Sequence, residues 1–307
     1  MRTFDILVIG SLNMDLVTRT PHLPKPGETI HGHEFRMVPG GKGAIQAAAI
    51  ARLGASVAML GRVGEDAFGE QVLGSLRAFG VDTQYVIIDV KATTGIATIL
   101  VDDKGENSIV VTAGANYKVN RRDLAQVAEL LPLAKYLVMQ LEIPLDVVQF
   151  AIEKAREHNL KVILNTAPAY PEAKSFLDKV DYLLLNETEA EVYTGRDVNV
   201  QADAEKAVHD LLSLGTPVVI LTIGERGALL GYDDQIMRIP TREVEVVDTT
   251  AAGDAFTGGF TAALNQGASL EEAVRYANAV GALTVTRLGA QTSLPSAAEV
   301  QSFLSSI

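Results

Sequence analysis

The sequence predicts an α/β protein with a Rossmann-like, doubly wound and mostly parallel sheet flanked by helices, plus a small antiparallel sheet. Short, continuous apolar runs alternate along the chain with segments of helical period, as strands buried on both faces of a parallel sheet do. Two other segments have the pattern of hairpin strands, which suits a sheet outside the core. The predicted core strands are Ile6–Gly10, Val57–Leu60, Tyr136–Gln140, Lys161–Asn165, Asp181–Asn186 and Val218–Thr222.

Helices and the smaller sheet follow from the segments between these runs. A 3.6-residue period predicts helices over Leu145–His158 and Ala202–Leu214. Leu12–Val38 is rich in Pro and Gly and ends in extended sequence, while Thr93–Ala115 is typical of two strands around the turn DDKGEN. Because no repeat, low-complexity tract or linker divides the chain, we expect one domain over residues 1–307, with the small sheet inserted early.

Composition excludes several classes of function. The chain has 26 Lys and Arg against 38 Asp and Glu, a net charge of −12, and no basic cluster, so a nucleic-acid partner is not expected. The absence of cysteine excludes disulfides, thiolate catalysis and cysteine-ligated metals. Neither a signal peptide nor an apolar run of about 20 residues is evident, so we expect a cytoplasmic protein without a membrane partner.

The first polar motif, GSLNMD, follows the first predicted strand and contains Asn13 and Asp15. Ligands of open α/β sheets bind beyond the carboxyl ends of the strands, so these two side chains are candidates for binding a polar substrate. An Asx turn explains the same residues equally well.

A glycine turn, Pro39-Gly-Gly-Lys42-Gly-Ala, precedes an alanine-rich helical segment. Glycines permit close backbone approach, and the amides at a helix start suit hydroxyls or anions. The motif is not a P-loop, because G-x-x-x-x-G-K-[ST] is absent. Taken alone, such a turn is more often structural than functional.

The motif Asp248-Thr-Thr-Ala-Ala-Gly-Asp254 is the sharpest feature of the chain. It follows the strand-like run EVEVV and precedes the helical segment AFTGGFTAAL. Unpaired amides at a helix start would stabilise charge on a transferring phosphoryl group, and Asp254 would accept the proton of an attacking hydroxyl. Asp254 as a simple helix cap is the alternative, and motif and context together favour catalysis.

Three further segments suit a nucleotide. Asn186-Glu-Thr-Glu189 ends a predicted strand and could hold phosphates and hydrated Mg²⁺, or form an ordinary helix cap. Thr222-Ile-Gly-Glu-Arg-Gly227 and Arg287-Leu-Gly-Ala-Gln-Thr-Ser293 are glycine loops that are either ligand-binding or simple turns. The five histidines are scattered; His31 and His33 alternate as on a strand, and surface positions are expected for them rather than a metal site.

Taken together, these motifs resemble the ribokinase family, the PfkB-type carbohydrate kinases. GSLNMD, PGET, GGKGA, TAGAN, QLE, NETEAE, TIGERG, DTTAAGDAF and RLGAQTS occur in the family order and cover the whole chain. The resemblance implies ATP-dependent phosphorylation of the primary 5-hydroxyl of D-ribose to ribose 5-phosphate, with Mg²⁺ and K⁺. It also implies a β-sheet lid, formed here by about residues 12–38 and 93–115, and a homodimer in which two lids pair.

The resemblance assigns roles residue by residue. Asp254 would be the base, and the amides of Ala251, Ala252 and Gly253 the anion hole. The sugar contacts would be Asn13, Asp15, Gly41, Lys42, Glu142 and the position of Ile45. The nucleotide contacts would be Asn186, Glu189, Thr222, Gly224, Gly227 and Asn278. The monovalent-cation loop would contain Asp248, Thr250, Thr284, Arg287, Gly289 and Ser293, largely through backbone carbonyls.

Ile45 departs from the family pattern, which has Asn directly after GGKGA. Isoleucine has a stiff branched side chain and no hydrogen-bond donor, so the sugar is less determined than the kinase chemistry. Kinases for deoxyribose, a nucleoside or another sugar therefore remain open, as does a non-catalytic sugar- or nucleotide-binding regulator. A Rossmann dehydrogenase is excluded, because no G-x-G-x-x-G follows the first strand.

Overall fold

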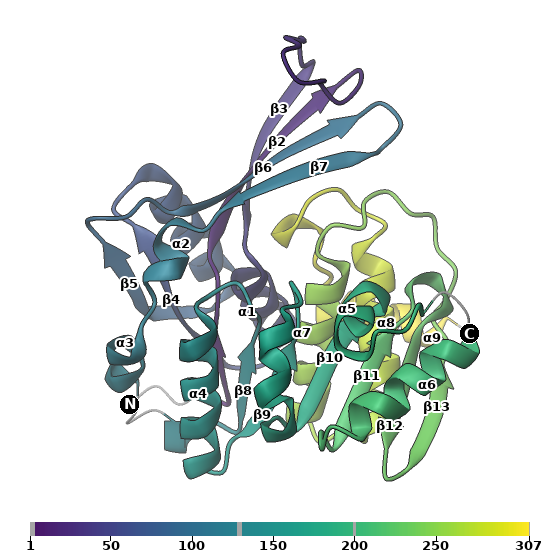
Figure 1. Ribbon diagram of the computed structural model, residues 1–307. Helices are drawn as coiled ribbons and strands as arrows, with labels where there is room; N and C mark the ends of the chain where they lie inside the picture. Colours follow the sequence, from purple (N-terminus) through teal and green to yellow (C-terminus); the bar gives the residue numbers. More distant parts are fainter. Residues whose placement is uncertain (1–3, 128–130, 199–200, 307) are drawn as a thin grey trace.

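The computed structural model describes residues 4–127, 131–198 and 201–306. Its core is a nine-stranded sheet with helices on both faces, and a four-stranded sheet projects from it (Figure 1). In chain order the strands of the large sheet are β1 (Ile6–Ile9), β4 (Val57–Gly64), β5 (Asp82–Asp89), β8 (Tyr136–Met139), β9 (Lys161–Asn165), β10 (Tyr182–Asn186), β11 (Val218–Thr222), β12 (Ala228–Tyr232) and β13 (Gln235–Ile239).

The large sheet confirms the predicted doubly wound architecture. Its strand order is β13-β12-β11-β10-β9-β8-β1-β4-β5, and the neighbours from β11 to β5 pair in parallel. All six predicted core strands are present. β5, β12 and β13 were not predicted; the last two form an antiparallel hairpin at the sheet edge.

Both faces of the large sheet are buried, which explains the continuous apolar runs. Ile6 and Val8 of β1 belong to one hydrophobic cluster, and Leu7 and Ile9 belong to the other. The first face is covered by α1 (Lys42–Arg52), α2 (Ala67–Phe79), α7 (Ala252–Asn265), α8 (Leu270–Thr284) and α9 (Ala297–Ser305). The second face is covered by α3 (Arg121–Gln126), α4 (Leu145–Glu157), α5 (Glu187–Thr194) and α6 (Gln201–Leu212).

The small sheet contains β2 (Asn13–Thr20), β3 (Glu34–Gly40), β6 (Gly95–Asp102) and β7 (Asn107–Thr112), in the order β3-β2-β6-β7. The predicted small sheet is therefore confirmed, with one difference. β2 and β3 form one antiparallel pair and β6 and β7 another, but β2 and β6 are parallel to each other. The reason is that both strands leave the core in the same direction, and each returns through its own hairpin.

The run EVEVV, expected to be a strand, is extended but joins neither sheet. The amides of Val247 and Asp248 instead donate to the carbonyl of Val285, at the end of α8, at 2.8 and 3.1 Å. Val246 and Val247 are both exposed, so the alternating pattern of this run does not mark a buried face. Within the described residues, no helix is long and apolar enough to cross a membrane.

Candidate active site

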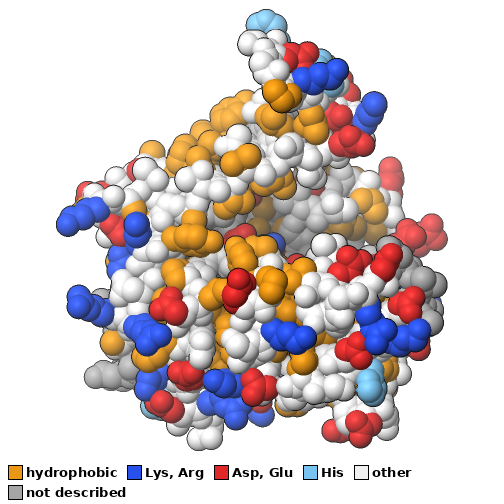
Figure 2. All heavy atoms as spheres, viewed as in Figure 1, with side chains coloured by type: hydrophobic (Ala, Val, Ile, Leu, Met, Phe, Trp, Pro, Cys, Tyr) orange, Lys and Arg blue, Asp and Glu red, His pale blue; other side chains and the backbone are white. Residues whose placement is uncertain are grey.

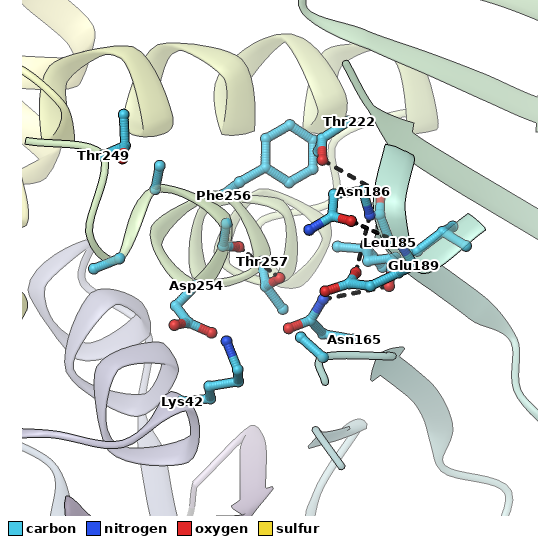
Figure 3. A pocket seen from close by; sticks show the side chains of 15 residues that line it. Lys42, Asn165, Leu185, Asn186, Glu189, Thr222, Thr249, Asp254, Phe256 and Thr257 are labelled. Carbon is cyan, nitrogen blue, oxygen red and sulfur yellow. Dashed lines mark hydrogen bonds between the residues drawn. The ribbon is translucent and has the colours of Figure 1, made fainter. Parts of the chain in front are cut away.

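A cleft lies at the carboxyl ends of the central strands, where α1, α5 and α7 converge (Figure 3). It joins the predicted base and its amides with one predicted sugar contact, Lys42, and with three of the predicted nucleotide contacts, Asn186, Glu189 and Thr222. The topology causes this convergence, because the loops that leave parallel strands open at the same edge of the sheet. The lining includes Lys42, Asn165, Asn186, Glu189, Thr222, Thr249, Ala251, Ala252, Gly253, Asp254 and Thr257.

The start of α7 is built to present backbone amides. Ala251 has φ 65° and ψ 1°, a left-handed conformation that is strained for alanine and that cannot continue as helix. No side chain caps the helix, so its first amides have neither a helical partner nor a side-chain acceptor. One exception modifies the expected anion hole: the Ala252 amide donates to the carbonyl of Thr249 at 3.2 Å. A Cβ added at Gly253 would meet no atom within 4 Å, which indicates open space there.

Asp254 lies in the first turn of α7 and is only 7% exposed. Burial raises the pKa of its carboxyl, and the nearby Glu142 raises it further. The Lys42 ammonium and a hydrogen bond from Gln46 oppose that rise. Figure 3 shows the end of the Lys42 side chain pointing toward the Asp254 carboxylate. Asp254 is thus a desolvated carboxylate held beside one cation, and it does not act as the helix cap.

Lys42 is the cation of the cleft. Burial alone would lower the pKa of its ammonium, but neighbouring carboxylates, led by Asp254 and Glu142, outweigh that effect and raise it. The turn before it needs glycine: Gly41 has φ 88°, and a Cβ there would lie 2.7 Å from the amide nitrogen of Asn13. The glycine turn therefore brings the first residue of α1 against the base of the small sheet.

Asn13 and Asp15 lie on β2, opposite Gly40 and Val38 of β3, so the Asx-turn alternative is wrong. Both side chains are buried. The side-chain amide of Asn116 donates to Asn13 Oδ1 at 2.7 Å. Burial, together with the neighbouring carboxylates, raises the pKa of Asp15 to about 7.

Glu142 is fixed by the loop that follows β1. Ser11 Oγ donates to Glu142 Oε2 at 2.5 Å, and the Lys42 amide donates to the same oxygen at 3.3 Å. Glu142, Asp15 and Asp254 also interact electrostatically with one another, so the three carboxylates lie around one region of the cleft. Their charges are only partly offset by Lys42, an arrangement suited to donors such as sugar hydroxyls.

Asn186 and Glu189 form a reciprocal capping box at the start of α5. Asn186 Oδ1 accepts from the Glu189 amide, and Glu189 Oε2 accepts from the Asn186 amide, both at 2.9 Å. The expected cap is therefore real, yet both side chains also line the cleft. Burial raises the pKa of Glu189. Oε1 of Glu189 and the side-chain nitrogen Nδ2 of Asn186 remain for a ligand.

The other predicted nucleotide contacts lie beyond β11. Thr222 ends β11 and lines the cleft, and Gly224 begins the short helix after it. Gly227 has φ 93°, and a Cβ there would collide with the carbonyl of Ile239. Asn278 of α8 donates to the same carbonyl at 2.9 Å. Gly227 and Asn278 therefore both lie against the end of β13, and neither of them lines the cleft.

The predicted cation loop is tied together by Asp248. Its Oδ1 accepts from the Thr250 amide and its Oδ2 from the Gly289 amide, both at 2.9 Å. Three other side chains of the loop already have partners. Thr284 Oγ1 donates to the Val280 carbonyl, Arg287 pairs with Glu299, and Ser293 Oγ donates to the Ala290 carbonyl. Any cation there would therefore depend on Asp248 and backbone carbonyls.

Ile45 is 4% exposed and belongs to the hydrophobic cluster on the α1 and α7 face of the sheet. It lies one turn after Lys42 on the same helix. The side chain fits its apolar surroundings and offers no hydrogen bond. All five histidines are exposed, and His31 and His33 lie outside any strand, between β2 and β3.

Several buried polar residues around the cleft were not singled out from the sequence. Gln46 Nε2 donates to Asp254 Oδ1 at 2.8 Å, and Gln140, Asn165, Asn116 and Ser11 contact other site residues. A single glutamine within the first turns of a helix, such as Gln46 in α1, forms no distinctive sequence pattern. The feature of the sequence that could have identified these residues is their position next to or within the motifs. Gln46 follows GGKGAI, Gln140 opens QLE and Asn116 ends TAGAN.

Comparison with known proteins agrees with this geometry. The model of the pfkB family of carbohydrate kinases matches residues 3–297, so the chain belongs to that family and is a phosphotransferase. It is 38% identical over 299 residues to a ribokinase of Haemophilus influenzae, covering 97% of this chain and 98% of the relative. It is 39% identical over 302 residues to a deoxyribokinase of Salmonella typhi, covering 98% and 99%.

Among solved structures, the fold is similar to that of an Arabidopsis thaliana ribokinase complexed with ribose and ATP. The TM-score is 0.90 at 32% identity, and the match covers 99% of both chains. The chain therefore has the ribokinase fold.

The raised pKa of Asp15 predicts a pH-dependent gain in stability on neutralising it. A carboxyl with a folded-state pKa near 7 and an unfolded one near 3.8 stabilises the fold fully only below 3.8, and loses this contribution as the pH rises through 7. We expect Asp15→Asn, without ligand, to raise Tm by several degrees at pH 8 and by less at pH 5.5, since linkage allows at most about 4 kcal/mol.

Differential scanning calorimetry at the two pH values measures this effect. Asp178→Asn, which makes the same charge change at an exposed site, is the control. A Tm gain for Asp15→Asn that is equal at both pH values would refute the assigned shift.

Proposed function

We propose that this carbohydrate kinase transfers the γ-phosphoryl group of ATP to the primary 5-hydroxyl of D-ribose, giving ribose 5-phosphate and ADP. The observation that carries the proposal is the buried Asp254 carboxylate beside Lys42, in the first turn of a helix without a side-chain cap. Relatives named ribokinase, and the similar structure that holds ribose and ATP, support the choice of substrates.

In the proposed reaction Asp254 accepts the proton of the 5-hydroxyl as its oxygen attacks the γ-phosphorus. The bond to the β,γ-bridging oxygen breaks, and its electron pair leaves with ADP. The amides of Gly253 and Asp254 stabilise the charge on the transferring group, assisted by the Lys42 ammonium. Asn13, Asp15 and Glu142 orient the sugar.

The residues at the nucleotide end fit a nucleotide with hydrated Mg²⁺. The described residues contain no cluster of three or more His, Asp or Glu side chains that could hold a metal ion. Mg²⁺ commonly keeps several waters and binds through one or two carboxylates and the substrate's phosphates. Glu189 and Asn186 would serve this role, with Thr222, Gly224, Gly227 and Asn278 toward the nucleoside. Magnesium would supply neutralisation of the phosphate charge.

A non-catalytic regulator is less well supported, because such a protein needs neither a desolvated carboxylate nor uncapped amides beside it. Among sugars, 2-deoxyribose is the specific competitor. Ile45 removes the amide that the family pattern offers to a sugar hydroxyl, and a relative of similar identity is named deoxyribokinase.

We also propose that K⁺ binds the loop joined by Asp248 and that two copies pair through their small sheets, each acting as a lid. For K⁺, the support is the carboxylate of Asp248 within a loop whose other side chains are already engaged. For pairing, the support is apolar exposure on the outer strands of the small sheet (Figure 2). Phe35, Met37, Ile109, Val110 and Val111 are each 48–64% exposed.

The base assignment predicts that Asp254→Asn lowers kcat at least on the order of 10²-fold, because the amide keeps the shape but cannot accept the proton. A coupled ADP-release assay with ribose, 2-deoxyribose, fructose and nucleosides measures it. Sugar affinity, by calorimetry, should be less affected than turnover. Exposed Asp178→Asn should retain the wild-type rate, and near-normal kcat in Asp254→Asn would sink the assignment.

The Ile45 proposal predicts that Ile45→Asn lowers KM for ribose several-fold, with a smaller change in kcat. An unpartnered buried hydroxyl costs about 1–3 kcal/mol, or roughly 5- to 150-fold in affinity. Ile45→Val keeps an apolar side chain and should leave KM near the wild-type value. A bridging water or neighbouring side chain already serving that hydroxyl would leave KM unchanged in Ile45→Asn, which would contradict the proposal.

The cation proposal predicts that activity falls when K⁺ is replaced by Na⁺ or tetramethylammonium at constant ionic strength. The ion would order the loop beside the first turn of α7 without entering the chemistry. Asp248→Asn should weaken the response to K⁺. Equal rates in all three salts would count against the loop assignment.

A further inference from the structure

A chain of buried amides lies behind the Asp254 carboxylate. Gln46, on α1, is fully buried, and its Nε2 donates to Asp254 Oδ1 at 2.8 Å and to Asn165 Oδ1 at 3.2 Å. Gln140, also fully buried, donates from Nε2 to Gln46 Oε1 at 2.6 Å. Asn165 in turn donates to the Leu184 carbonyl at 3.3 Å. Two strands, β9 and β10, the loop after β8 and helix α1 thus contribute to the position of one carboxylate.

The direction of this chain follows from the chemistry of its ends. Ionised Asp254 can only accept hydrogen bonds, so Gln46 must turn its amide nitrogen toward it. Gln46 Oε1 then faces Gln140, which must turn its own nitrogen toward Gln46.

The hydrogen-bonded series from Gln140 through Gln46 to Asp254 contains a feature that stability alone does not explain. Among the described residues, Gln140 Oε1 is buried without a hydrogen-bond partner. The backbone also makes room for it, since a Cβ on Gly10 would collide with that oxygen. An apolar pair of similar volume would avoid the unpaired oxygen. The arrangement is therefore suited to the carboxylate it holds.

We propose that Gln46 is a positioning residue for the base, oriented by Gln140. It holds Oδ1 of Asp254, which leaves Oδ2 for the proton of the sugar hydroxyl. In this proposal Gln46 acts on the reaction through the base and not by binding sugar or nucleotide itself. This inference rests on the function proposed above.

Loss of the Gln46 donor also has a predictable effect on titration. The charged groups that act on Asp254 are Lys42 from α1, Glu142 from the loop after β8, Glu189 from α5 and Asp15 from β2. Of these, only Lys42 favours the ionised carboxylate, and the Gln46 hydrogen bond is the other contribution that lowers its pKa. Without that bond, the pKa of the base rises.

The test compares pH profiles of kcat for Gln46→Met, Gln140→Met and the double variant. Methionine keeps the length and volume of glutamine without its donors. We expect Gln46→Met to move the acid limb of kcat upward by about one pH unit, so that kcat at any pH on that limb falls about ten-fold. KM for the sugar should change less than three-fold. Gln140→Met should shift the limb in the same direction by less.

The double variant separates positioning from general loss of packing. Because Gln140 acts only through Gln46, the double variant should match Gln46→Met alone. Thr216→Val, which removes a buried hydrogen bond of 2.7 Å to the Leu177 carbonyl at the other end of the strands, should leave the profile unchanged.

A Gln46→Met profile superimposable on the wild type, or effects of the two substitutions that simply add, would overturn the inference. If Gln46→Met does not fold, a Gln140→Met profile identical to the wild type would overturn it equally. Full activity of Asp254→Asn would instead refute Asp254 as the base, and wild-type protein that releases no ADP with ribose would refute the proposed function, so the three failures are distinguishable.

Discussion

The site depends on a carboxylate buried against an ammonium, Asp254 of α7 beside Lys42 of α1. Removing either charge from water is costly, and a buried ion without its partner is costlier still. The two helix starts must therefore be held in register. That is done by close packing of α1 on α7, where a Cβ on Gly258 would collide with the Cβ of Ala49 on α1. The strained Ala251 and the glycine turn at Gly41 bring the two ends into the same cleft.

Around this pair, electrostatics and backbone geometry serve the same purpose. Carboxylates collect around the predicted sugar contacts, where burial and its neighbours raise the pKa of Asp15 to about 7. Uncapped amides collect at the start of α7, the predicted phosphate site. An anionic phosphoryl group and a neutral polyol would therefore meet opposite environments a short distance apart, with Asp254 between them. The cost to the unliganded protein is a cleft with partly unbalanced charge.

The small sheet is connected to this cleft at its base. Asn13 begins β2, pairs with Gly40 of β3 and Gly95 of β6, and accepts a hydrogen bond from Asn116 after β7. Any movement of the sheet is therefore transmitted to a predicted sugar contact. Its outer strands expose Phe35 and Val110, a surface that a second copy would cover under the proposed pairing.

The sequence by itself determined the class of fold, because burial on both sheet faces requires continuous apolar strands. It also identified the motifs that line the cleft, because glycine turns and helix starts leave local signatures.

Other features required the tertiary structure. EVEVV has the pattern of a strand, yet it joins neither sheet, and the amide of its last residue, Val247, donates to the carbonyl of Val285 at the end of α8. Asn13 and Asp15 fit a turn equally well until β3 pairs with them. Gln46 and Gln140 carry no local signature, because their hydrogen-bond acceptors are distant in the sequence. Gln140 donates to Gln46, 94 residues away, and Gln46 donates to Asp254, 208 residues away. Periodicity records which face of an element is buried, whereas the partner that a buried polar group meets is decided by packing between elements.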